Sequence, residues 1–162
     1  MATLYEYYIT GDDTNAFICE TYWLAQTFTP SIAHKITSVK LKLYRTGLPG
    51  TGTISIKATD GAGHPTGGDL CSGTIDGNTL TTNAAGAWYE ITLGAGYDLN
   101  ADTKYAIVVR ITGGSTSNCI RWRCDETSPT YTPGCFEVSD NSGSSWTSNT
   151  GIDFMFEDWG EP

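Results

Sequence analysis

A strict alternation of apolar and polar residues is the feature that most constrains how this chain can fold. In segment 36–45, Val39, Leu41 and Leu43 alternate with serine and lysine side chains. A period of two is the geometry of a β-strand with one face buried and the other in water. The same alternation recurs in segments 54–57, 88–93, 105–111, 120–124 and 152–157. The pattern predicts an all-β protein.

Glycine-rich connections separate the alternating segments. Turn residues at 45–52 predict a hairpin between the strands on either side, and further turns are expected at 60–68 and 76–78. Segments 4–9, 22–28, 70–75 and 136–138 bring the count to about ten strands. That number, at this spacing, is typical of a two-sheet antiparallel β-sandwich. No linker or internal repeat divides the sequence, so we expect a single domain over residues 1–162.

The charge of the chain restricts its partners. The formal net charge is −9, which repels nucleic acid and anionic lipid and leaves a neutral ligand, a cation or another protein as partners. No apolar run approaches the ~20 residues of a membrane span. The first residues lack the basic and apolar regions of a signal peptide, and release within a virus particle needs no such signal. The expected location is therefore extracellular or on a virion surface.

The chain has five cysteines, an odd number that cannot pair completely within one molecule. Cys124 and Cys135 are the best candidates for a disulfide, and closing the loop between them would contribute ~3 kcal/mol. Buried, reduced cysteines are an equal alternative. The spacing of the cysteines lacks a CxxC pair, which argues against a zinc site.

Residues Ser139 to Trp146 resemble the Asp-box hairpin, a structural turn, with Asn141 in place of the usual aspartate. Asparagine can make the same bonds from its side chain to the backbone, so we expect the turn to form. In this resemblance the glycine supplies a positive φ and the tryptophan packs beneath the turn. The motif predicts an all-β fold and does not indicate a catalytic activity.

Four motifs together resemble the choice-of-anchor jelly-roll modules. They are Gln26-Thr-Phe-Thr-Pro30, the segment 36–47, Gly86-Ala-Trp-Tyr-Glu-Ile91 and Lys104-Tyr-Ala-Ile-Val-Val109. Such modules are similar in fold to carbohydrate-binding modules and occur in bacterial and environmental surface proteins and in phage structural proteins. The resemblance implies a jelly-roll β-sandwich and says little about the ligand, because one fold hosts many tasks.

No cofactor is required by the sequence, but jelly-roll modules commonly carry a structural calcium ion, and the resemblance extends this expectation to the present chain. Carboxylates near the chain ends are the candidate ligands: Asp12, Glu20, Asp153 and Asp158. No segment has the regular acidic spacing of a dedicated calcium loop.

Sugar binding on a sandwich needs exposed aromatic rings together with polar partners for hydroxyl groups. Trp88 and Trp146 are candidates from their strand and turn positions, and Tyr131 from its place between two prolines. Arg121 and Arg123 lie two residues apart on an outer face and could clamp a polar ligand. The alternatives are core packing for the aromatic side chains and solvated or carboxylate-paired positions for the arginines.

These observations favour a non-catalytic recognition or adhesion module that binds a glycan or another surface. The alternative is a structural component of a surface or virion, such as a decoration or fibre domain, whose partner is its own copies or a capsid. A glycoside hydrolase comes third: Glu90 with Glu137 or Glu157 would have to flank one bond. No Gly-x-Ser-x-Gly motif points to a serine nucleophile. We therefore predict that the chain is not an enzyme.

Overall fold

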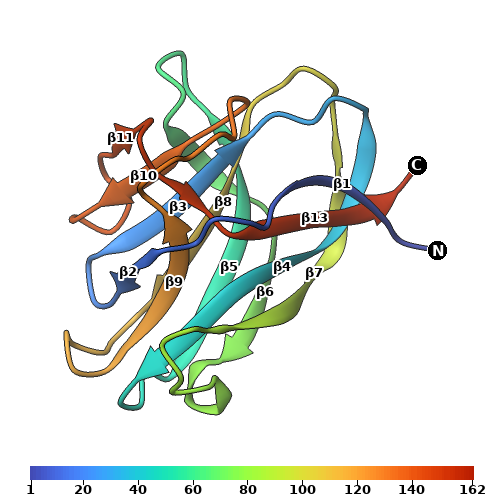
Figure 1. Ribbon diagram of the computed structural model, residues 1–162. Helices are drawn as coiled ribbons and strands as arrows, with labels where there is room; N and C mark the ends of the chain where they lie inside the picture. The colour runs from blue at the N-terminus through green and yellow to red at the C-terminus, as the bar shows by residue number, and fades with distance from the viewer.

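The computed structural model describes residues 1–162, and its regular secondary structure consists of β-strands and one short 3₁₀ turn (Figure 1). The strands are β1 (Thr3–Tyr8), β2 (Thr14–Ile18), β3 (Trp23–Phe28), β4 (His34–Thr46), β5 (Thr51–Thr59), β6 (Pro65–Asp76), β7 (Ala87–Leu99), β8 (Tyr105–Ile111), β9 (Cys119–Asp125), β10 (Phe136–Ser139), β11 (Thr147–Asn149), β12 (Asp153–Phe154) and β13 (Phe156–Glu161). The 3₁₀ turn η1 spans Gly77–Thr79, between β6 and β7.

The strands form two antiparallel sheets with nested pairing. In the six-stranded sheet the order is β11-β10-β3-β8-β5-β6. In the seven-stranded sheet β4 is central: β7 pairs with it on one side, and β13 and β9 pair with successive parts of it on the other. Strands β1 and β2 pair outside β13 and β9, and β12 extends β9. Three strand pairs are nested along the chain: β5 with β8 lies inside β4 with β9, which lies inside β3 with β10. This nested order is the topology of a jelly roll.

The all-β antiparallel sandwich is confirmed, with thirteen strands where the sequence predicted about ten. Most of the additional strands are short. Strand β11 is entirely polar and exposed, and β12 has only two residues. Short strands of this kind carry too few residues to display a period of two.

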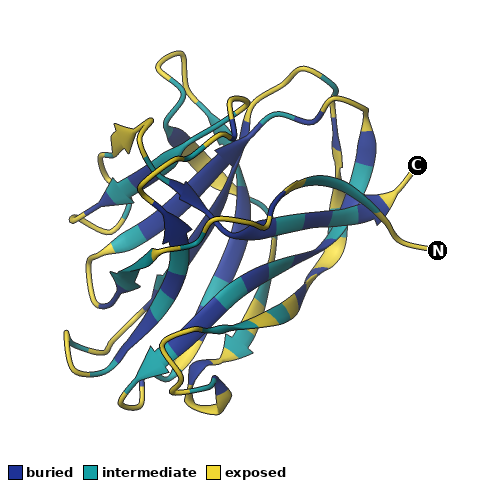
Figure 2. Cartoon of the chain, in the orientation of Figure 1, coloured by how far each residue is buried: buried dark blue, intermediate teal, exposed yellow.

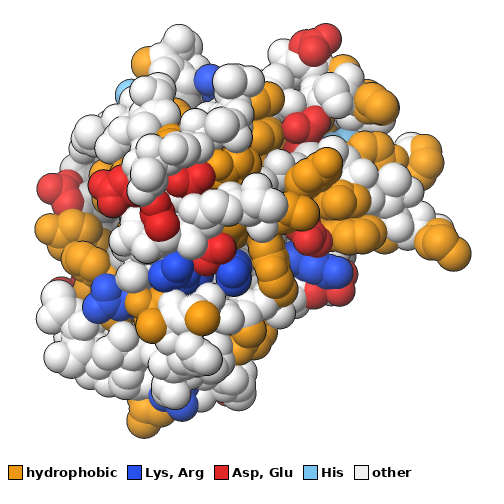
Figure 3. Space-filling model, viewed as in Figure 1, with side chains coloured by type: hydrophobic (Ala, Val, Ile, Leu, Met, Phe, Trp, Pro, Cys, Tyr) orange, Lys and Arg blue, Asp and Glu red, His pale blue; other side chains and the backbone are white.

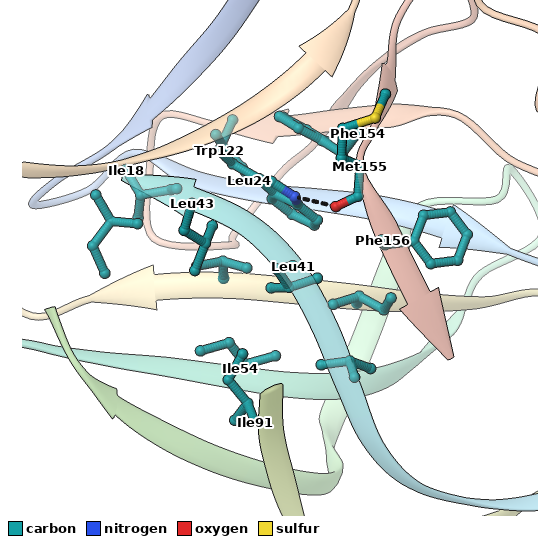
Figure 4. Close-up of a cluster of buried hydrophobic side chains, with 14 of the residues drawn as sticks. Ile18, Leu24, Leu41, Leu43, Ile54, Ile91, Trp122, Phe154, Met155 and Phe156 are labelled. Atoms are coloured by element: carbon teal, nitrogen blue, oxygen red, sulfur yellow. Dashed lines mark hydrogen bonds between the residues drawn. The ribbon is translucent and has the colours of Figure 1, made fainter. Parts of the chain in front are cut away.

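The core lies between the sheets and contains one cluster of 27 buried residues (Figures 2 and 4). At its centre the Trp122 ring stacks on Phe154, with the ring centroids 4.1 Å apart. The indole Nε1 of Trp122 donates a hydrogen bond of 2.9 Å to the carbonyl oxygen of Met155. This hydrogen bond satisfies the only polar group of a fully buried side chain and connects β9 to the segment between β12 and β13.

Two local predictions were wrong. The connection 45–52 is not a hairpin, because β4 belongs to the seven-stranded sheet and β5 to the six-stranded sheet. The alternation expected over 152–157 fails at Met155, which is fully buried along with both of its neighbours. Met155 lies in the short break between β12 and β13, and its amide donates a hydrogen bond to the carbonyl of Arg123. The alternation of inward and outward side chains is interrupted at this residue. No helix in the structure is long and apolar enough to cross a membrane.

Candidate functional site

The centre of the outer face of the six-stranded sheet carries mostly small side chains, together with one glutamate. The register places Glu137 of β10 opposite Ala25 of β3, Ala25 opposite Val108 of β8, and Val108 opposite Ser55 of β5. All four are at most 1% exposed although they face away from the core between the sheets. Small residues in these rows leave room for chain segments to lie across the sheet.

Two loops cover this outer face. The loop 60–64 between β5 and β6 reaches across the sheet, and the Nδ1 atom of His64 lies 2.8 Å from Oε2 of Glu137 on β10. The turn 140–146 between β10 and β11 approaches from the other side, and Trp146 packs with Trp23 against the small residues of the sheet. The covered face is therefore framed by a histidine loop and a tryptophan turn.

Between the two loops lies a cleft of about 500 Å³. Its lining consists of Trp23, Lys57, Asp60, His64, Trp146 and the segments 65–67 and 142–145. Serine and threonine side chains, glycine backbone and two indole rings all contribute to this lining. The volume falls within the ~300–1,000 Å³ usual for ligand pockets.

Opposite charges are paired beside the cleft. Asp69 accepts a 2.6 Å hydrogen bond from Arg110 and lies 3.2 Å from the ammonium group of Lys57. Burial opposes ionisation of this carboxyl, but the hydrogen bond and charge of Arg110 keep its pKa below the usual value. The Arg110 guanidinium also lies over the Trp23 ring, 5.3 Å from its centroid. The two cations near the cleft, Lys57 and Arg110, thus share the single carboxylate of Asp69.

His64 is the polar group best placed to meet a ligand. Its partner Glu137 is 1% exposed, and burial raises the pKa of that carboxyl although the His64 hydrogen bond opposes the shift. Glu137 fixes the ring through Nδ1, while Nε2 makes no hydrogen bond within the chain. A held imidazole with a free Nε2 can exchange a hydrogen bond with a ligand hydroxyl.

The turn that carries Trp146 has the local bonds expected from its sequence. The Asn141 side-chain oxygen accepts hydrogen bonds of 2.9 Å from the Ser145 amide and of 2.9 Å from the Ser139 hydroxyl. Gly143 has a φ of 81°, in the left-handed region. The turn places Trp146 partly buried at the edge of the cleft, so this residue lines the cleft, and its role as a ligand contact stays a prediction.

Other predicted ligand residues lie away from the cleft. Trp88 is 37% exposed on β7, in the other sheet. Arg121 donates to the side chain of Asn15, and Arg123 donates a 2.9 Å hydrogen bond to Asp12, so both arginines are engaged by neighbouring segments. Figure 3 shows basic and acidic side chains close together in a band across the face in view.

Tyr131 is a correction, because the expected exposed loop tip is buried. Its side chain is 9% exposed and its hydroxyl donates a 3.1 Å hydrogen bond to Glu6. Its backbone amide donates to the buried carboxylate of Asp153. The two flanking prolines shape the loop, but these bonds draw the tyrosine inward, where no ligand can stack on it.

The four carboxylates considered for calcium do not converge. Asp12 is held by Lys42 and Arg123, whose hydrogen bonds lower its pKa against the opposing effect of burial. Asp158 pairs with His34 in the core, with Nε2 of the ring 3.0 Å from the carboxylate. Asp153 receives its bonds from Gln26 and Tyr131, and Glu20 is exposed in the turn after β2. No group of three or more acidic, histidine or cysteine side chains is placed to hold a metal ion.

The predicted disulfide between Cys124 and Cys135 is also wrong, since all five cysteines are free. Cys124 points into the core from β9, and burial raises the pKa of its thiol to about 12. Cys135 precedes β10, where the next residue, Phe136, packs against the core. Alternation therefore directs Cys135 away from the core and from Cys124.

Sequence reasoning named Trp146 and Glu137 but missed the pairing of Glu137 with His64. These two residues are 73 positions apart, and nothing in the local sequence of either indicates the other. Glu90, considered as a catalytic partner of Glu137, hydrogen-bonds Ser38 in the seven-stranded sheet. The two glutamates therefore lie on opposite faces of the sandwich and cannot flank one glycosidic bond.

Comparison with known proteins supplies the fold and no family. No family model matches the sequence, and no curated protein matches it, so neither resemblance drawn from its motifs becomes a family assignment. The chain superposes on the crystal structure of the cysteine protease and lectin-like domains of Cwp84, a surface-layer associated protein of Clostridium difficile, with a TM-score of 0.59 and 15% identity. The match covers 99% of this chain and 36% of that one. At this identity the likeness establishes a shared β-sandwich fold.

Proposed function

We propose that this chain is a non-catalytic recognition module that binds a saccharide in the cleft between the His64 loop and the Trp146 turn. The observation that carries the proposal is the pairing of an indole ring with held polar groups in one cleft. A pyranose ring packs its C–H groups on an aromatic face, and its hydroxyl groups need partners of the kind His64 and Asp60 provide.

The likeness to a protein that contains a lectin-like domain supports this proposal, as does its association with a surface layer. We propose an extracellular surface as the location of the module. A protein partner is the second candidate. It is favoured by large exposed apolar side chains, among them Tyr7, Ile9 and Ile32, and Figure 3 shows hydrophobic side chains gathered on the side where both termini lie.

The test is a glycan array probed with the labelled protein, once with calcium and once with a chelator, followed by titration calorimetry on the glycans that bind. Trp146→Ala should weaken binding at least about tenfold, or about 1.4 kcal/mol, by removing the aromatic platform. Trp88→Ala is the matched control, because it removes an exposed tryptophan from the other sheet and should leave affinity unchanged.

Three results would decide against the cleft. An array without binding in both conditions rejects glycan recognition. Equal affinity of Trp146→Ala and the unaltered protein moves the site elsewhere, and loss of binding only in Trp88→Ala moves it to the seven-stranded sheet. If glycans fail, light scattering over a range of concentrations tests self-association, the first form that the protein-partner candidate would take.

A further inference from the structure

We propose that Cys19 and Cys119 form a cross-strand disulfide site that closes when the folded chain meets a small organic disulfide such as oxidised glutathione. The bond would covalently cross-link the end of β2 to the start of β9. It is independent of the saccharide proposal, and it differs from the pairing that the sequence suggested.

The register of the β2–β9 ladder carries the inference. Thr14 lies opposite Cys124, and the pairing continues one residue at a time to Ile18 opposite Ile120. The ladder ends there, and continuing its register by one step would bring Cys19 opposite Cys119, where β9 begins. Opposed residues of antiparallel strands have Cα atoms about 4.5–5.5 Å apart and side chains on the same face. A disulfide spans Cα separations of about 4.4–6.8 Å, so a continued register would bring the two cysteines within reach of each other.

The surroundings of the two thiols agree with this placement. Cys19 is 3% exposed, Cys119 is 0% exposed, and both belong to the same core cluster. Burial, followed by the nearby Cys119 thiol, raises the pKa of Cys19, as expected for two sulfur atoms that lie close together. The Cys119 thiol now donates to the carbonyl of Thr116, at 3.7 Å, so the bond requires its side chain to rotate.

The other cysteines lack such a partner. Cys124 lies opposite Thr14 in the same ladder, Cys71 is on β6 in the other sheet, and Cys135 precedes β10. Cys119 is fixed on its other side by pairing with Thr46 of β4. Strand β2 pairs only with β9, so this edge strand can separate and admit an oxidant to the buried thiols.

The chemistry balances as a thiol–disulfide exchange. One cysteine thiolate attacks the oxidant and forms a mixed disulfide, which releases one glutathione thiolate. The second cysteine thiolate then attacks the protein sulfur of that mixed disulfide and releases the other glutathione. The protein gives up two protons and two electrons, and the oxidant is reduced to two thiols.

Peptide mapping tests the proposal on the unaltered protein. After incubation with oxidised glutathione, the protein is unfolded in denaturant, alkylated with iodoacetamide and digested with trypsin. Cleavage after Lys35, Arg110 and Arg121 puts the two cysteines in separate peptides, 1–35 and 111–121. We expect these peptides to be linked and the other three cysteines to be alkylated. Alkylation of all five, or a link through any other cysteine, overturns the proposal.

Thermal unfolding gives a second readout. The disulfide closes a loop of about 100 residues, so oxidation should raise the Tm by roughly 10 °C. Cys119→Ala should abolish this shift, whereas Cys71→Ala, the control, should keep it. An equal shift in Cys119→Ala, or no shift in the unaltered protein, counts against the bond.

Discussion

Gly143→Ala is the perturbation that most directly probes how the tryptophan turn is built. Gly143 has a φ of 81°, and a Cβ atom added there would lie 2.8 Å from Cζ3 of Trp23. The left-handed backbone costs an alanine about 1–2 kcal/mol. Forcing Trp23 or the turn to move adds about 1–3 kcal/mol, as for overpacked cores. We therefore expect the free energy of unfolding to fall by about 3 kcal/mol.

Two further glycines separate these contributions. Gly50 has a φ of 79° with nothing within 4 Å of an added Cβ, so Gly50→Ala carries only the backbone cost of about 1–2 kcal/mol. Gly68 has neither a positive φ nor a neighbour within 4 Å, and its substitution should change stability by less than about 0.5 kcal/mol. The difference between Gly143→Ala and Gly50→Ala measures the contact with Trp23.

Urea unfolding followed by intrinsic fluorescence gives the three free energies, with equal m-values as the condition for comparing them. If Gly143→Ala lowers the free energy of unfolding no more than Gly50→Ala does, the Trp23 contact imposes no constraint on the turn and the prediction is wrong. The same variant should weaken glycan binding, since Trp23 and the turn both line the cleft. Gly50→Ala should bind normally.

Two other predictions concern the core. Trp122→Phe leaves the Met155 carbonyl without its indole donor and should lower the free energy of unfolding by about 1–3 kcal/mol, measured by urea titration; an unchanged midpoint would contradict the bond. Burial alone would lower the pKa of His34, but the hydrogen bond to Asp158 raises it overall, so its contribution to stability is full below about pH 6.5 and declines as pH rises through the folded-state pKa. In Asp158→Asn, NMR titration should show the His34 pKa falling, and the pH dependence of unfolding should flatten; an unmoved pKa would mean that Asp158 is not the cause.

The sequence identified the strands whose side chains alternate cleanly. Segments 36–45 and 105–111 became β4 and β8, because a period of two states directly which side chains face the core. The turn at 139–146 was also readable, since its hydrogen bonds join residues within four positions of one another. Such local geometry can be predicted from sequence because the residues that determine it are neighbours in the chain.

The partner of a strand is not local. Turn residues at 45–52 encode a reversal of the chain, but only packing of both sheets decides that β5 crosses to the other one. The sequence predicted an exposed Tyr131 between two prolines, but in the structure its hydroxyl donates a hydrogen bond to Glu6, 125 positions away. Cys124 and Cys135 are close in sequence, yet Cys124 belongs to the core cluster and Cys135, just before β10, does not.

The same division applies to the cleft. The sequence alone determined an acidic, antiparallel β-sandwich with a tryptophan at the end of a structured turn. The tertiary structure decided that Trp146 shares a cleft with His64 and that a buried Glu137 holds the histidine. Distant residues meet only after the register of β10, β3, β8 and β5 is fixed, and that register depends on burying the core of the whole sandwich.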